Sequence, residues 1–225
     1  WILSRLNNAC REVHKGLEAY NFNEAAMAAY KFVWNEFCDW YIELSKSSLF
    51  QSGSQKQVTQ NVLVHVLEAS LRLLHPFMPF ITEEIWQKLP KEGSSIMMAP
   101  FPVYEDEKED PKTEKDLALV MDIITSVRNI RGEMNLNPGL TLNLLIKLED
   151  PETGSTITDN IKYIKELARI REFDIGPTIE KPRMAMSSVL NGMEIIVPLE
   201  GIMNFREEKN RIEKELKKIE KNIIV

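Results

Sequence analysis

Residues 24–47 read EAAMAAYKFVWNEFCDWYIELSKS. At about 100° per residue, the large apolar side chains of this segment gather on one face of a helix. That wide stripe consists of Met27, Tyr30, Val33, Trp34, Phe37, Cys38, Trp40, Tyr41 and Leu44. A stripe of this width is typical of a helix that packs against two neighbours, so the segment predicts a central helix of a bundle.

The same periodicity predicts four further helices around this one. They cover residues 2–20, residues 58–74, a short segment that begins after His75-Pro76, and residues 116–134. Proline at position 76 ends or kinks the third helix because its ring excludes a continued helical hydrogen bond. Five amphipathic helices with mostly short connections predict an antiparallel bundle.

The pattern changes after residue 139. Residues 140–148 alternate between apolar and polar side chains typical of a strand, and residues 156–170 have helical periodicity. Asn191-Gly192 separates two further strand-like runs, and this dipeptide is the strongest short signal for a hairpin. Residues 201–225 then carry an apolar seam at heptad spacing, formed by Phe205, Ile212, Leu216, Ile219 and Ile223. We therefore expect a mainly α chain, with a helical bundle over 1–139, a small β-α-β-β subdomain over 140–200 and a truncated coiled-coil helix over 201–225. A single coiled-coil strand without a partner predicts that the chain is a fragment of a longer protein.

The composition is that of a globular protein. The 225 residues are 44% hydrophobic and 28% charged, and no apolar run approaches the roughly 18–20 residues of a membrane span. No secretory signal is visible. The two cysteines, Cys10 and Cys38, both fall on predicted apolar helix faces, which predicts buried, reduced thiols and a cytoplasmic setting.

The charge is unevenly distributed. The net charge of −6 argues against indiscriminate electrostatic binding to nucleic acid. Much of it comes from residues 104–116, which hold seven carboxylates and three lysines between prolines. This acidic segment predicts a solvated linker or loop.

No catalytic constellation, phosphate-binding glycine loop or metal-ligand spacing is present. The chain is therefore expected to bind or position a partner, with no catalytic or metal site of its own. The polar face of the first helix gathers donors for phosphates and base edges, namely Arg5, Asn8, Arg11 and Lys15. The alternative is that these side chains form an ordinary solvated face.

Two other features suggest nucleic-acid contact. Phe32 lies opposite the apolar stripe of its helix, so an exposed ring is predicted that stacks an unpaired base, unless another helix covers it. Arg128 and Arg131 lie at the margin of an apolar stripe, where they meet RNA, a neighbouring domain or an internal carboxylate.

Four segments carry a resemblance to a known family. HPFMPFITEEIWQKLP at residues 75–90 resembles the anticodon-binding helical domain of class I aminoacyl-tRNA synthetases for valine, isoleucine, leucine and methionine. Within that group, residues 1–13, 32–46 and 127–139 are similar to the valyl-tRNA synthetases, and so is the heptad tail. An isoleucyl or leucyl relative is the alternative, but a cysteine-rich zinc domain is expected in the isoleucyl enzymes and only two cysteines are present.

The resemblance implies a module that docks the anticodon stem-loop of tRNA(Val) for a monomeric parent enzyme, which activates valine with ATP and attaches it to the tRNA. The His-Ile-Gly-His and Lys-Met-Ser-Lys-Ser signatures are missing, so the catalytic domain, its ATP and magnesium, and the editing domain are expected upstream. The arm residues Lys209, Arg211, Lys214, Lys217 and Lys218 are then expected to touch the tRNA body. A scaffold or protein-interaction bundle without RNA contact of its own is the competing hypothesis.

Overall fold

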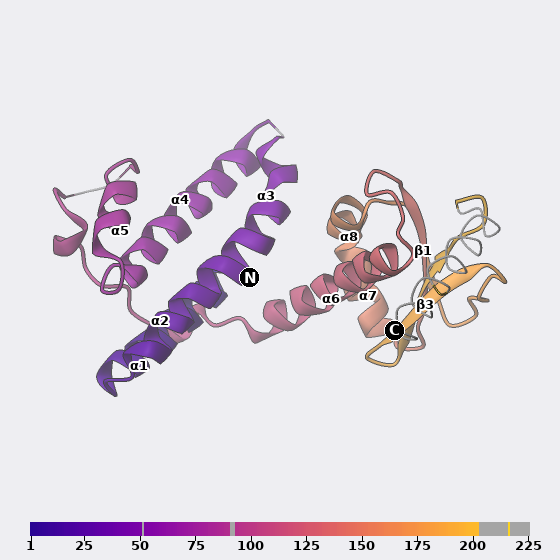
Figure 1. The fold of residues 1–225 in the computed structure, drawn as a ribbon, viewed down its shortest axis with the longest axis horizontal. Coiled ribbons are helices and arrows are strands. Elements are labelled where there is room, and N and C mark those ends of the chain that lie inside the picture. Colours follow the sequence, from indigo (N-terminus) through magenta and orange to yellow (C-terminus); the bar gives the residue numbers. More distant parts are fainter. Residues whose placement is uncertain (51, 91–92, 203–215, 217–225) are drawn as a thin grey trace, which may run out of the picture. The chain divides into compact units, whose positions relative to one another are not determined.

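The computed structural model describes residues 1–50, 52–90, 93–202 and 216. The chain divides into two compact units, Trp1–Ala118 and Leu119–Val225 (Figure 1). The boundaries that we predict at residues 139 and 200 separate segments of different composition, and they stay a prediction.

The first unit is helical, as the apolar periodicity predicts. Its longer helices are α1 (Ile2–Glu18), α2 (Phe22–Lys31), α3 (Ile42–Leu49), α4 (Ser54–Leu74) and α5 (Pro79–Trp86). A π-helix, η1 (Phe32–Tyr41), lies between α2 and α3, and η2 (Ile96–Met98) and η3 (Asp106–Lys108) are single 3₁₀ turns. Helix α6 (Pro111–Glu133) begins in this unit.

The predicted central helix is present, but its buried face is only partly the predicted one, since Phe37 and Leu44 of the stripe are buried. Helices α2, η1 and α3 follow each other without a break in helical backbone, from residue 22 to residue 49. The apolar side chains buried along them are Ala25, Ala29, Phe32, Phe37 and Leu44. Met27, Tyr30 and Trp34 of the predicted stripe are each about half exposed, and Cys38 is also exposed. The predictions of a buried Cys38 and an exposed Phe32 are therefore wrong.

Two physical causes account for this change of face. A glycine on α1 allows α2 to approach closely, since a Cβ atom on Gly16 would lie 2.9 Å from the backbone nitrogen of Ala25. Small side chains thus make this contact in place of the large ones. The π-helix adds the second cause, because its i→i+5 hydrogen bonds place neighbours on one face five residues apart, as with Phe32 and Phe37.

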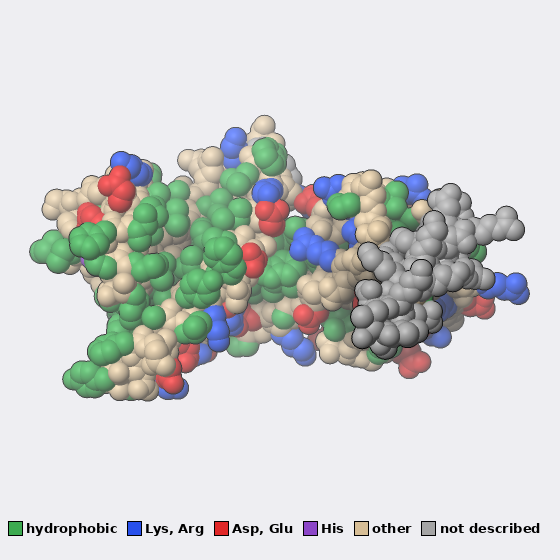
Figure 2. Space-filling model, viewed as in Figure 1, with side chains coloured by type: hydrophobic (Ala, Val, Ile, Leu, Met, Phe, Trp, Pro, Cys, Tyr) green, Lys and Arg blue, Asp and Glu red, His purple; other side chains and the backbone are tan. Residues whose placement is uncertain are grey.

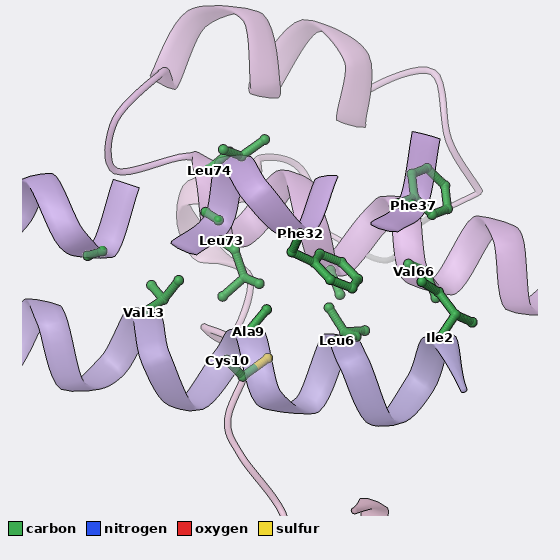
Figure 3. Packing of buried hydrophobic residues seen from close by; sticks show 13 residues of the cluster. Ile2, Leu6, Ala9, Cys10, Val13, Phe32, Phe37, Val66, Leu73 and Leu74 are labelled. Carbon is green, nitrogen blue, oxygen red and sulfur yellow. The ribbon is translucent and has the colours of Figure 1, made fainter. Parts of the chain in front are cut away.

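The core of the helical unit lies between α1, the α2–η1 segment and α4. Figure 3 shows Leu6, Cys10 and Val13 of α1 beside Phe32 and Leu73. Val13 and Leu73 have no exposed surface, and Phe32 is 2% exposed. Phe32 is therefore a central core residue of this unit.

The second unit contains a four-stranded mixed sheet. Its strands are β1 (Leu142–Lys147), β2 (Ile170–Gly176), β3 (Ala185–Leu190) and β4 (Met193–Pro198), in the order β2-β1-β4-β3. Strands β1 and β2 are parallel and are connected through α7 (Pro151–Asp159) and α8 (Ile161–Ala168), where one helix is predicted. The β3–β4 hairpin is confirmed, with positive φ angles of 49° at Asn191 and 81° at Gly192.

The arm predicted over residues 201–225 lies almost wholly outside the described residues, and so do Lys209, Arg211, Lys214, Lys217 and Lys218. Within the described part of the chain, none of the helices combines the length and apolar composition that crossing a membrane requires.

Candidate nucleic-acid interface

Arg5 lies on the polar face of α1 and is held by two carboxylates. Its Nε and Nη2 donate to Glu36 at 2.7 and 2.8 Å, and its Nη1 donates to Glu114 at 2.8 Å. The hydrogen bond to Glu36 is the main cause that raises the pKa of Arg5, against the opposing effect of burial. The guanidinium therefore links α1 to η1 and to the first turn of α6.

The acidic segment is a largely exposed loop over residues 105–110, as its composition predicts, and it docks on this same face of α1. Asn7 Nδ2 donates to the backbone oxygen of Glu105 at 2.8 Å, and Asn7 Oδ1 accepts from the Glu105 N–H at 2.9 Å. Ser4 Oγ accepts from the backbone N–H of Asp110 at 2.9 Å and donates to Glu114. Asn7 and Ser4 thus hold the backbone of the segment along α1. Two of its carboxylates, Glu109 and Glu114, form ion pairs with Arg11 and Arg5 of that helix.

Asp110 ends the acidic segment and starts α6. Thr113 donates to it from Oγ1 at 2.6 Å and from its backbone N–H at 3.0 Å, which lowers the pKa of Asp110. An aspartate before Pro111 combines an N-terminal cap with a proline suited to the first helical turn. This cap places Glu114 beside α1.

Asn8 and Arg11 are also engaged. Asn8 Nδ2 donates to Glu114 at 2.8 Å, and its Oδ1 accepts from Arg11 Nη2 at 2.7 Å. Arg11 also pairs with Glu109, and its guanidinium lies 4.9 Å from the centre of the Tyr104 ring. Three of the four donors predicted on α1 therefore already have acceptors within the protein.

Lys15 differs from these three. It is exposed, and no ion pair of Lys15 is found among the residues that the structure describes. It lines a groove of about 540 Å³ between α1 and α2, together with Arg5, Asn8, Met27 and Lys31. The groove also contains Glu12, Glu24 and Glu36, so its cations are matched by carboxylates.

The exposed aromatic surface lies beside Phe32 in the sequence. The rings of Tyr30 and Trp34 are stacked, with centroids 6.2 Å apart and planes 6° apart. They are 52% and 56% exposed. Sequence reasoning missed them because it placed both in the core, although the alanines at positions 25 and 29 signal a close-packed face on the other side of α2.

Arg128 and Arg131 bind backbone oxygens inside the second unit. Arg128 Nη2 donates to Leu167 at 3.0 Å, and Arg131 donates to Leu140 at 2.8 Å and to Ala168 at 3.0 Å. These acceptors include the last carbonyls of α8, which have no partner within that helix. These backbone oxygens are internal partners for both guanidinium groups.

Across the described residues, no cluster of three or more histidine, cysteine, aspartate or glutamate side chains is arranged to hold a metal ion. The polar face of α1 instead presents hydrogen-bond donors and acceptors held in place by ion pairs, an arrangement suited to binding a partner.

Comparison with known proteins adds the family context. Residues 1–146 match the family described as the anticodon-binding domain of tRNA ligase. The chain is 44% identical to the valine–tRNA ligase of Syntrophotalea carbinolica, 42% to that of Enterococcus faecalis and 45% to that of Geobacter sulfurreducens. These alignments cover 99–100% of this chain but only 25–26% of each relative, so the chain spans about a quarter of their length.

Proposed function

The chain belongs to the family of anticodon-binding domains of tRNA ligases, and we propose that it binds the anticodon stem-loop of tRNA(Val) as one part of a valine–tRNA ligase. The observation that carries this proposal is the similarity to valine–tRNA ligases over essentially the whole chain. The ATP-dependent attachment of valine, and the catalytic and editing domains that it needs, belong to the rest of such an enzyme.

We propose that α1 provides the RNA-facing donors. Anticodon bases are unstacked, so their edges are open to side chains such as Asn8 and Arg11. Among the donors on α1, Lys15 is the one for which no ion pair is found in the described residues, and Lys31 lines the same groove. The other proposed contacts are Arg5, Arg128 and Arg131, whose donors already bind internal acceptors, and Lys209, Arg211 and Lys214 of the arm. Phe32 is withdrawn from this set because its ring is buried.

The proposal is tested by measuring binding of the chain to tRNA(Val) at two fixed salt concentrations, beside the same tRNA with its anticodon bases changed. We expect the changed anticodon to bind more weakly at both concentrations. Equal and strongly salt-dependent binding of both RNAs would mean docking on the backbone alone. Absence of binding to either RNA would contradict the proposal.

Lys15→Ala removes one proposed phosphate contact, and Lys15 has no ion pair to lose among the residues that the structure describes. Each phosphate contact contributes about one to the slope of log affinity against log salt, so the variant should lower that slope by about one. The matched control is Lys88→Ala, which removes an exposed lysine two residues after α5 whose ion pair in the described part of the chain is with Glu84. An unchanged slope in Lys15→Ala would exclude Lys15 from the interface.

The acidic segment competes with RNA for Arg11 in this scheme. Glu109→Gln removes the carboxylate that pairs with Arg11, and an exposed pair of this kind is worth about 0.2–1 kcal/mol, so tRNA affinity should rise up to about fivefold. Glu107→Gln is the control, since it makes the same charge change in the same segment at an exposed residue for which no ion pair is found in the described part. Equal gains in both variants would reflect net charge alone.

The pairing of Arg5 and Arg11 with carboxylates favours a second candidate function, a scaffold that holds other domains without binding RNA itself. In that case, the RNA contacts lie elsewhere in the longer enzyme. A chain that folds but binds no tRNA at low salt would support this candidate.

A further inference from the structure

A strip of exposed apolar side chains runs along α2 and η1. Met27, Tyr30 and Trp34 are 51%, 52% and 56% exposed, and Cys38, one turn further on, is exposed as well. The spacing of three, four and four residues places them on one side of the helical segment. These four residues are called the α2–η1 strip below.

The residues of the strip lie next to each other along one side of the helical segment, so they are not scattered singly over the surface. A buried aromatic side chain covers about 150–250 Å², so three large side chains that are each half exposed offer roughly 300 Å². Contiguous apolar patches of that size on a single protein are often functional. The parallel rings of Tyr30 and Trp34 make the middle of the strip flat and preformed. Figure 2 shows hydrophobic patches between charged groups on the visible face of the helical unit.

The chemistry of the strip favours a protein partner over RNA. Stacking platforms for single-stranded RNA are accompanied by a positively charged groove. None of the four residues is charged, and the adjoining groove between α1 and α2 balances Arg5, Lys15 and Lys31 with three glutamates. The helical spacing of the strip instead forms a ridge of the kind that packs into the groove of another helix.

The area indicates which protein partner fits. A stable interface between separate molecules buries about 800 Å² on each partner, well above what the strip offers. A segment of the same polypeptide needs less area because its effective concentration is of the order of millimolar. The relatives are about four times as long as this chain, which leaves ample sequence for such a segment.

We propose that the α2–η1 strip packs against an amphipathic helix from another part of the same polypeptide, outside residues 1–225. This inference rests on the proposed function, in which the chain is one part of a longer ligase. The strip is thus an internal docking face of that enzyme, and the RNA-facing donors lie on α1 beside it.

Cys38 provides the test, because it lies on the strip while the only other thiol of residues 1–225, Cys10, is 3% exposed. Iodoacetamide alkylation is followed by mass spectrometry in the 225-residue chain and in the full-length polypeptide that contains it. Trypsin separates the two thiols, in peptides 32–46 and 6–11. Burial raises the pKa of Cys10 to about 11, so its peptide should react slowly in both samples and serve as the internal control.

We expect Cys38 to react at least about tenfold more slowly in the full-length polypeptide than in the 225-residue chain, without RNA in either sample. Equal rates would overturn the proposal. Protection of Cys38 in the 225-residue chain by added tRNA(Val) alone would assign the strip to RNA, and protection that grows with protein concentration would assign it to a second copy. Both results would also overturn it.

A variant separates docking from folding. Trp34→Glu should lower the Tm of the full-length polypeptide but leave that of the 225-residue chain unchanged, because Trp34 is exposed there. Phe50→Glu, at a residue 86% exposed near the end of α3, is the control and should change neither. Equal effects of Trp34→Glu in both polypeptides would contradict docking. Since tRNA binding is measured separately, a failure of the proposed function remains distinguishable from a failure of this one.

Discussion

Replacing Phe32 by alanine is expected to lower the free energy of unfolding by about 3–5 kcal/mol, the usual cost of removing a buried phenylalanine ring. The ring is 2% exposed and belongs to the cluster formed by α1, the α2–η1 segment and α4. Urea denaturation measures the effect as a lower midpoint with an unchanged slope.

Trp34→Ala is the matched control for Phe32→Ala. It removes a larger ring from the same π-helix, but from a position that is 56% exposed, so the free energy of unfolding should change by about 0.5 kcal/mol or less. The two variants together distinguish the core face from the surface face. A stable Phe32→Ala variant with weakened tRNA binding would reverse our conclusion and restore Phe32 as a stacking residue.

Gly16→Leu is expected to destabilise the helical unit by about 2–3 kcal/mol, the range for overpacked cores. Even a Cβ atom at this position would lie 2.9 Å from the backbone nitrogen and 3.0 Å from the Cα of Ala25. Those atoms belong to the backbone of α2, so relief requires the helix to move. Thermal or urea denaturation of the purified variant measures the loss.

Gly132→Leu controls for the intrinsic effect of replacing a helical glycine. This residue lies in α6, and a Cβ atom there has no neighbour within 4 Å. Because glycine is a poor helix former, the substitution should be neutral or stabilising by up to about 1 kcal/mol. Equal losses in the two variants would mean that the approach of α1 and α2 at Gly16 is not the cause.

The sequence predicts the second unit well because its signals are local. Asn191-Gly192 specifies a turn with two positive φ angles whatever surrounds it, and the alternation over residues 140–148 matches β1, in which Leu142, Leu144 and Ile146 are buried. The one helix predicted over residues 156–170 is two, α7 and α8, separated at Asn160. Local periodicity therefore locates the elements, with boundaries that shift by a few residues.

The acidic segment shows what composition leaves undecided. Carboxylates and prolines in series predict a solvated linker or loop, and residues 105–108 are indeed exposed. Composition does not show that Asn7 and Ser4 bind the backbone of this loop, or that Arg11 and Glu109 pair. The partners lie about 100 residues apart in the chain, and no local pattern links them. Arg5, Asn8 and Arg11 lie on α1, and their internal acceptors are visible only in the folded chain, while a role toward RNA stays a prediction.

Periodicity, turn chemistry and motifs are properties of short segments, so the sequence predicts the mainly helical fold, the position of most elements, the hairpin and the family resemblance. Three features follow only from the folded chain: which large side chains of residues 22–49 are buried, which charges are paired and which aromatic rings meet solvent. These features depend on neighbours that are distant in the sequence. Phe32 points inward and Trp34 outward because of the contact between Gly16 and Ala25 and because of the π-helix. A helical wheel drawn from the sequence contains neither of these features.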